Sequence, residues 1–215
     1  MKKVIAINGS PRKKGNTAVL LQHALDGASE AGAATEMIHL YDLDYQGCIS
    51  CFACKKKNSK FIGRCASRDG LSPVLEKAMQ STVLLLGSPI YFGNITGEMQ
   101  SFLERLLFMN LSYDHPSRST FTGCIHMGFI YTMGLPDSLM REVGYDTLIA
   151  QRKARYSMIL KGKWEDLIST DTCQFDDYSQ YAAGLFDEAH KKKVQAEQFP
   201  IDCEKAHVLG KGLAG

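Results

Sequence analysis

The chain has 215 residues, of which 45% are hydrophobic and 22% charged, a composition typical of a globular domain that buries its own core. Its net charge of +2 is too small to indicate binding to nucleic acid or to an anionic membrane. No apolar run approaches the roughly 18 residues that cross a bilayer, and the apolar run at residues 4–7 is too short for a signal peptide. We therefore expect a soluble protein of the cytoplasm.

Short β-rich runs alternate along the chain with longer amphipathic segments. The runs that predict strands are 4–7, 35–40, 82–86, 124–131 and 164–169. The segments that predict helices are 16–31, 71–80, 97–109, 137–160, 181–196 and 202–213. This alternation predicts an α/β fold: a doubly wound, five-stranded parallel sheet of order 2-1-3-4-5 with helices on both faces.

The segment between the first strand and the first helix has the composition of a phosphate-binding loop. A helix that begins there offers free N–H groups and the positive end of its dipole to an anion. Side-chain donors, one positive charge and a glycine for tight turning add to this. The residues concerned are Ser10, Arg12, Gly15, Asn16 and Thr17. A P-loop or a G-x-G-x-x-G site is excluded by the sequence, and a plain turn with an Asn helix cap is the alternative.

The run Gly-Ser-Pro-Arg-x-x-Gly-Asn-Thr at residues 9–17 resembles the FMN phosphate loop of the flavodoxin-like, NADPH-dependent FMN reductases, a family that includes the iron–sulfur flavoproteins. The resemblance extends over the strand and helix alternation to about residue 134. It implies a flavodoxin-like fold, FMN as cofactor and NAD(P)H as co-substrate, with the loop's side chains on the FMN phosphate. We expect an FMN-binding domain at 1–170 and a helical extension at 171–215 packed on it.

Two further loops follow strands whose carboxyl ends meet at the same edge of such a sheet. In the family, a Ser-Pro-x-Tyr loop similar to the one after the third strand packs against the flavin ring, where N–H groups and aromatic faces would contact it. Its residues here are Ser88, Pro89, Ile90, Tyr91, Phe92, Gly93 and Asn94. A hydrophobic turn on the core is the alternative. The loop after the fourth strand, with Thr132, Met133 and Gly134, is expected at the same site. Only its place in the topology indicates this, since its residue types carry no clear signal.

The seven cysteines are odd in number and partly clustered, which argues against a disulfide framework. Cys48, Cys51 and Cys54 form a C-x2-C-x2-C run, and Cys65 follows within a Cys-rich loop at 47–70. Four thiolates can hold a [4Fe–4S] cluster, and the run resembles the motif of the iron–sulfur flavoproteins, although its gap before Cys65 is longer. Zinc, a redox-active dithiol and reduced thiols are the alternatives, and reduced thiols are as consistent with the pattern as a cluster.

Two features near the end of the chain allow several interpretations. Residues 171–178 are acidic and aromatic, and they could border the flavin, form a subunit contact or cap a helix, of which the cap is favoured. The lysines at 191–193 favour a solvated helix face.

We therefore predict an FMN-dependent NAD(P)H oxidoreductase that passes electrons through bound FMN to a flavin, a quinone or another small acceptor. The protein would bind and orient the cofactor, which does the chemistry, so no catalytic acid or base is required. The alternatives are an iron–sulfur flavoprotein or flavodoxin-type carrier reduced by a partner protein, and a non-enzymatic binding protein. The nearly neutral charge favours the enzyme over a carrier. The resemblance implies a homodimer or homotetramer, and no nucleic acid or membrane is expected as a partner.

Overall fold

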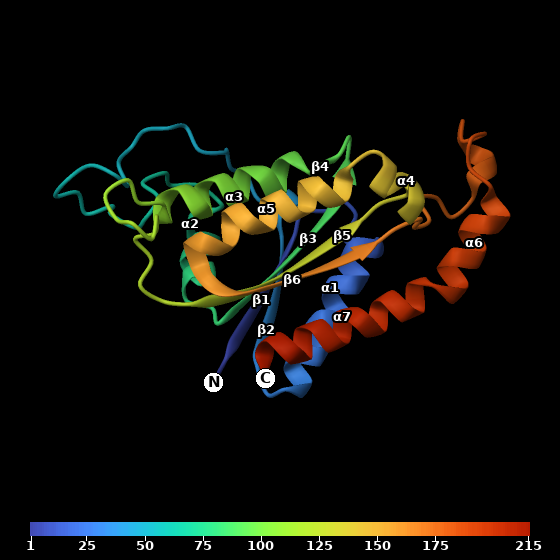
Figure 1. Cartoon of the computed structure of the whole chain (residues 1–215), viewed down its shortest axis with the longest axis horizontal. Coiled ribbons are helices and arrows are strands. Elements are labelled where there is room, and N and C mark those ends of the chain that lie inside the picture. The colour runs from blue at the N-terminus through green and yellow to red at the C-terminus, as the bar shows by residue number, and fades with distance from the viewer.

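A parallel sheet runs through the centre of the computed structural model, which describes all residues from 1 to 215 (Figure 1). Its strands are ordered β2-β1-β3-β5-β6. They are β1 (Lys3–Asn8), β2 (Ala34–His39), β3 (Val83–Tyr91), β5 (Ile125–Thr132) and β6 (Lys161–Ser169). The short β4 (Asn94–Ile95) pairs antiparallel with the end of β3. With β4 set aside, the predicted flavodoxin-like fold and strand order 2-1-3-4-5 are confirmed.

Helices cover both faces of this sheet, as the crossovers between parallel strands require (Figure 1). One face is covered by α1 (Asn16–Glu30) and α7 (Phe199–Ala214). The other is covered by α2 (Ser72–Met79), α3 (Gly97–Asn110) and α5 (Tyr145–Leu160). The short helices α4 (Asp137–Glu142) and α6 (Glu188–Glu197) lie beyond the carboxyl ends of the strands, with the 3-10 turns Leu40–Asp42 and Tyr178–Gln180 in the connections. No helix combines the length and the hydrophobicity of a membrane span.

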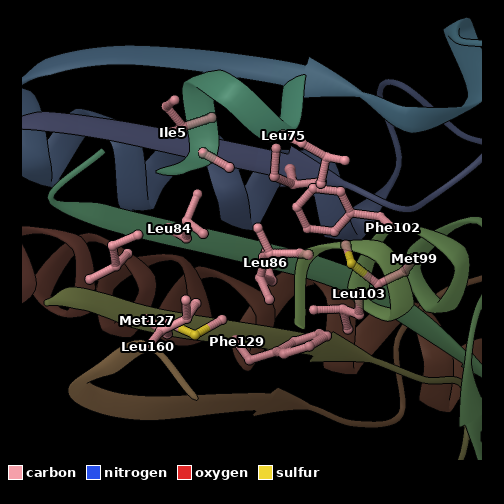
Figure 2. Packing of buried hydrophobic residues seen from close by; sticks show 14 of the residues in the cluster. Ile5, Leu75, Leu84, Leu86, Met99, Phe102, Leu103, Met127, Phe129 and Leu160 are labelled. Atoms are coloured by element: carbon pink, nitrogen blue, oxygen red, sulfur yellow. The ribbon is translucent and has the colours of Figure 1, made fainter. Parts of the chain in front are cut away.

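Alternate residues of the central strands supply two separate cores. Ile5 and Ile7 of β1 pack toward α2, α3 and α5, whereas Val4 and Ala6 pack toward α1 and α7. Figure 2 shows the first of these cores, in which Leu84 and Leu86 of β3 lie among side chains of the covering helices such as Phe102. The central strands are thus apolar on both faces, which is why they read as continuous hydrophobic runs.

The glycines of α1 and α7 allow the two helices to touch. A Cβ at Gly27 would lie 2.0 Å from the carbonyl oxygen of His207, and one at Gly210 would lie 1.8 Å from that of Ala24. Neither atom could be accommodated without moving a backbone. Helix α7 therefore packs directly on α1, and the two helices form one layer.

Two of the predicted helices have different boundaries in the structure. The segment 137–160 is divided into α4 and α5 at Gly144, whose φ of 76° interrupts the helical backbone. The second piece ends with Lys161 in the left-handed region, where β6 begins. The helix expected from 181 begins only at Glu188, where Asp187 caps it by accepting a hydrogen bond from the His190 N–H.

Candidate functional site

A cavity of about 1060 Å³ opens at the carboxyl edge of the sheet, where a doubly wound fold binds its ligands. Its walls come from the loop after β1, the end of β3, the loop after β5 and the C-terminal region from residue 172. Most of the predicted site residues line it: Ser10, Arg12, Gly15, Asn16, Thr17, Pro89, Ile90, Tyr91, Thr132, Met133 and Gly134. Three segments that are far apart in the sequence are thereby brought to one site.

The loop after β1 is folded by its own polar groups. The N–H of Ser10 donates to Oδ1 of Asn8 at 2.9 Å, and the N–H of Arg12 donates to Oγ of Ser10 at 3.2 Å. Helix α1 then begins without any side-chain cap, since its N-cap residue is Gly15. Its first N–H groups are therefore available to an anion, in the way that helix N-termini bind phosphate.

Gly15 leaves space in this loop, although its backbone is not left-handed. Its φ is −80°, a value open to any residue. A Cβ at this position would, however, lie 3.0 Å from the Cβ of Arg12, so a side chain would crowd the loop.

The polar side chains of this loop reach toward other walls of the cavity. Arg12 donates from Nη1 to the carbonyl oxygen of Gln174, and Asn16 donates from Nδ2 to that of Cys173 at 2.8 Å. The hydroxyl oxygens of Thr17 and Thr132 are 2.7 Å apart, and both residues are buried. These contacts fix the relative positions of the first loop, the loop after β5 and the C-terminal segment.

Four of the predicted residues shape the β3–β4 hairpin and do not line the cavity. Ser88 is buried, and its hydroxyl donates to the carbonyl oxygen of Pro89 and accepts from the N–H of Thr96. Phe92 and Gly93 form the two-residue turn, with φ values of 49° and 78°, as a turn of type I′ requires. Oδ1 of Asn94 accepts a hydrogen bond from Nη2 of Arg152 at 2.7 Å.

The C-terminal wall of the cavity is the part that was not predicted. Its residues are Thr172, Cys173, Gln174, Phe175, Asp176, Tyr181, Lys192, Gln195, Ala196 and Phe199. The ring of Phe175 stacks on that of Tyr181, with centroids 4.0 Å apart and planes 15° apart. The acidic and aromatic composition of residues 171–178 was the only feature of the sequence that pointed to this wall. Bordering the flavin was one of the three interpretations of that composition. The favoured cap is also present, because Asp177 accepts from the N–H of Ser179.

An ion-pair network attaches this wall to the loop after β5. Lys191 is only 3% exposed, which contradicts the solvated position expected for it. Its ammonium group donates to the carbonyl oxygen of Gly134 at 2.6 Å and to the carboxylate of Asp171, which also lies 2.6 Å from Nε2 of His190. Burial alone would raise the pKa of Asp171, but hydrogen bonds from Lys191 and His190 outweigh it and lower the pKa below its ordinary value.

The charged side chains around the cavity favour an anionic ligand. Arg12, Lys14 and Lys192 are the cations of its lining, and Asp176 is the carboxylate. Together with the uncapped start of α1, this excess of positive charge suits a phosphate group.

The four cysteines of the 47–70 loop lie around a second, much smaller cavity of about 20 Å³, which shares no residue with the first. Cys54 is buried, Cys51 is exposed, and burial raises the pKa of the Cys54 thiol. No three His, Cys, Asp or Glu side chains have the arrangement of a formed metal site. The donor set fits a thiolate-ligated centre in its chemistry and in the cavity that the four cysteines share.

Comparisons with known proteins agree with this geometry. The model of the NADPH-dependent FMN reductase family matches residues 2–129. An iron–sulfur flavoprotein of Methanocaldococcus jannaschii is 38% identical over 103 residues, which cover 48% of this chain and 51% of that protein. The chain thus spans about half the length of the curated relatives it matches.

Solved structures extend the similarity over the whole chain. The NAD(P)H:quinone oxidoreductase of Methanothermobacter marburgensis superimposes with a TM-score of 0.64 and 14% identity, over 100% of this chain and 98% of that chain. The FMN-dependent NADH-azoreductase of Bacillus anthracis, solved in complex with FMN, gives a TM-score of 0.63 and 13% identity over 100% of both chains. At these identities the two structures establish the fold.

Proposed function

The chain belongs to the NADPH-dependent FMN reductase family, as the loop at residues 9–17 predicted, and from this premise we propose that it is an FMN-dependent NAD(P)H oxidoreductase. The cavity of about 1060 Å³ would hold FMN, with the phosphate at the start of α1. Bound FMN supplies the redox chemistry, accepting a hydride from NAD(P)H and passing electrons to an acceptor.

The observation that carries this proposal is the convergence on one cavity of an uncapped helix start and the donors Arg12 and Asn16. These groups would neutralise and hydrogen-bond the phosphate. The end of β3, at Pro89 to Tyr91, and the loop 132–134 would flank the ring with apolar surface and backbone polar groups.

The size of the cavity favours an enzyme over a one-electron carrier. Small-molecule sites occupy roughly 300–1,000 Å³, and this cavity reaches the upper end of that range at about 1060 Å³. A second planar molecule could therefore share the site with FMN. By analogy with the quinone oxidoreductase and the azoreductase that share the fold, we propose a small-molecule acceptor such as a quinone. A homodimer or homotetramer in the cytoplasm stays a prediction.

Replacing Arg12 by Gln, or Asn16 by Ala, tests the site. Loss of a hydrogen bond between a charged group and the phosphate costs about 1.5–3 kcal/mol, so the dissociation constant of FMN should rise about 10- to 150-fold for Arg12→Gln and less for Asn16→Ala. Quenching of FMN fluorescence on binding gives this constant. Lys13→Gln is the matched control, since Lys13 pairs with Asp42 at 2.7 Å and does not line the cavity. Unchanged FMN affinity in both site variants would contradict the proposal.

Anaerobic mixing with NADPH or NADH tests the activity separately from FMN binding. Rapid loss of the visible absorbance of oxidised flavin is the expected result, since the proposed site admits the nicotinamide beside the ring. A flavin that binds tightly but stays oxidised with both coenzymes would identify a carrier.

The second candidate function is that of an iron–sulfur flavoprotein, in which a [4Fe–4S] cluster exchanges electrons with the flavin or with a partner protein. The observation that favours it is the gathering of Cys48, Cys51, Cys54 and Cys65 around one cavity. The similar protein of M. jannaschii carries this name. Iron and acid-labile sulfide assays on protein purified without oxygen test it, and absence of both would leave the thiols as reduced cysteines.

A further inference from the structure

Arg105 is a buried cation whose hydrogen bonds are incomplete. It lies on α3 with 2% of its surface exposed. Its Nη1 donates to Oδ2 of Asp69 at 2.5 Å and to the carbonyl oxygen of Gln46 at 3.2 Å. Its Nε and Nη2 are buried and have no partner.

This arrangement destabilises the folded state, because each buried donor loses its hydrogen bonds to water and forms none with the protein. Asp69 balances the charge of Arg105, yet it contacts only one of the three nitrogen atoms. A guanidinium group offers five N–H donors in a fixed plane, so the unused donors define where a further acceptor would lie. An anionic acceptor would satisfy them best.

The candidates for that acceptor are the sulfur atoms of the small cavity. Arg105 lines this cavity together with Cys48, Cys51, Cys54 and Cys65. A neutral thiol is a weak acceptor and would leave the guanidinium group poorly compensated. A thiolate bound to metal, or the sulfide of a cluster, carries the negative charge that a buried Arg requires.

The cysteine run is held against the same helix. The ammonium group of Lys55 donates to the carbonyl oxygens of Phe108 and Met109 at the end of α3, and it lies 4.8 Å from the centroid of the Phe108 ring. The ring of Phe52 contacts Phe108 edge-on, with centroids 5.7 Å apart. Residues on both sides of the third cysteine of the run are therefore anchored within one turn of Arg105, on a rigid element.

We propose that Arg105 is a positioning residue for a [4Fe–4S] cluster on Cys48, Cys51, Cys54 and Cys65, to whose sulfur atoms it donates hydrogen bonds from Nε and Nη2. The inference rests on the second candidate function above. The cluster supplies one-electron transfer when bound. A hydrogen-bonding cation beside it stabilises the more negative, reduced state, so Arg105 raises the reduction potential and Asp69 keeps its guanidinium group in place.

The experiment uses the full chain with Arg105→Gln and Arg105→Lys, purified without oxygen and reconstituted with ferrous iron and sulfide. Wild-type protein should contain iron and sulfide in equal amounts. Arg105→Gln should shift the midpoint potential of the cluster to more negative values, because the positive charge is lost. Arg105→Lys keeps the charge but loses the planar donors, and it should restore part of the shift. An anaerobic redox titration followed by electron paramagnetic resonance gives the potentials.

Two further variants separate this role from a purely structural one. Asp69→Asn breaks the ion pair but retains the cation, so it should lower stability to urea without moving the potential to more negative values. Lys60→Gln removes an exposed positive charge from the same loop, outside the small cavity, and should leave the potential unchanged. A structural role alone would give lower stability for Arg105→Gln and Asp69→Asn with the same potential in both.

Three outcomes would overturn the proposal: wild-type protein without iron and sulfide, zinc in place of both, or an Arg105→Gln cluster with the wild-type potential. FMN content and bleaching by NADPH are measured on the same samples. Because the small cavity shares no residue with the large one, these two readouts should persist even if the cluster proposal fails.

Discussion

Asp171 and Lys191 lie together beneath the C-terminal wall of the large cavity, and neither charge is stable there alone. Asp171→Asn would leave the ammonium group of Lys191, 3% exposed, without its counter-ion. We expect the free energy of unfolding to fall by about 3–5 kcal/mol, the usual cost of breaking a buried pair from one side. Urea denaturation measures it. Lys193→Gln is the control, since Lys193 only meets Glu197 at 4.0 Å on the surface and its loss should change stability by under about 0.5 kcal/mol.

The same carboxylate makes stability depend on pH. Burial tends to raise the pKa of Asp171, but hydrogen bonds from Lys191 and His190 outweigh it, so the folded-state pKa lies below the ordinary one. The stabilisation is then complete above the unfolded-state pKa of about 3.9 and is lost as the pH falls through the folded-state pKa. The difference in stability between the wild type and Asp171→Asn should shrink as the pH falls below the unfolded-state pKa. Urea denaturation at a series of acidic pH values tests it, and a difference that stays constant or grows on acidification would contradict this assignment.

The position of a residue could be predicted from the sequence where its contacts are close in the chain, and not where its partners are distant in the chain. Ser10, Arg12 and Asn16 were predicted because the loop, the strand before it and the helix after it are contiguous, so the local pattern carries the geometry. Lys191 was wrongly expected in solvent. Three successive lysines look solvated, and its partners at Asp171 and Gly134 are 20 and 57 residues away. Phe92 was expected at the flavin, but the turn it forms is fixed by strand pairing and lies outside the cavity.

At the scale of elements, the contact between α1 and α7 depends on two glycines, and this can be tested on one helix. Gly210→Ala gains up to about 1 kcal/mol in helix propensity but forces its Cβ to within 1.8 Å of the Ala24 carbonyl oxygen. Overpacking costs about 1–3 kcal/mol or more, so we expect a net loss of stability. Gly212→Ala, on the same helix with open space around it, should instead stabilise the protein. Thermal unfolding compares the two, and equal shifts would contradict the packing.

The elements themselves were predictable where the periodicity was clear, and the errors lie at glycines and charged segments. The strand order followed from the alternation of strands and helices. The break at Gly144 was missed because an isolated glycine inside a helical pattern is often tolerated, and only its positive φ shows otherwise. The late start of α6 was missed because residues 181–187 make their contacts with the aromatic segment around Phe175 and not along a helix.

For the whole molecule, we expect residues 1–170 and 171–215 to fold as one unit. α7 covers one face of the sheet together with α1 (Figure 1), and the core on that face includes Leu20 and Leu21 of α1 and Leu85 of β3. A chain that ends at residue 170 would expose this core and lose the C-terminal wall of the cavity. We therefore expect it to lack a cooperative thermal transition and to bind no FMN. A truncated protein that melts cooperatively and binds FMN would show that the first region folds by itself.

The hydrogen bonds from Arg12 and Asn16 to the carbonyl oxygens of Gln174 and Cys173 join positions 162 and 157 residues apart. In the proposed function, a phosphate that uses these same donors would displace the two carbonyl oxygens, so uptake of the cofactor would be an exchange of partners. Release of residues 173–174 would then contribute to both the affinity and the rate of loading. A stretch of chain near the opposite end of the sequence would thereby tune a site built around the loop after β1.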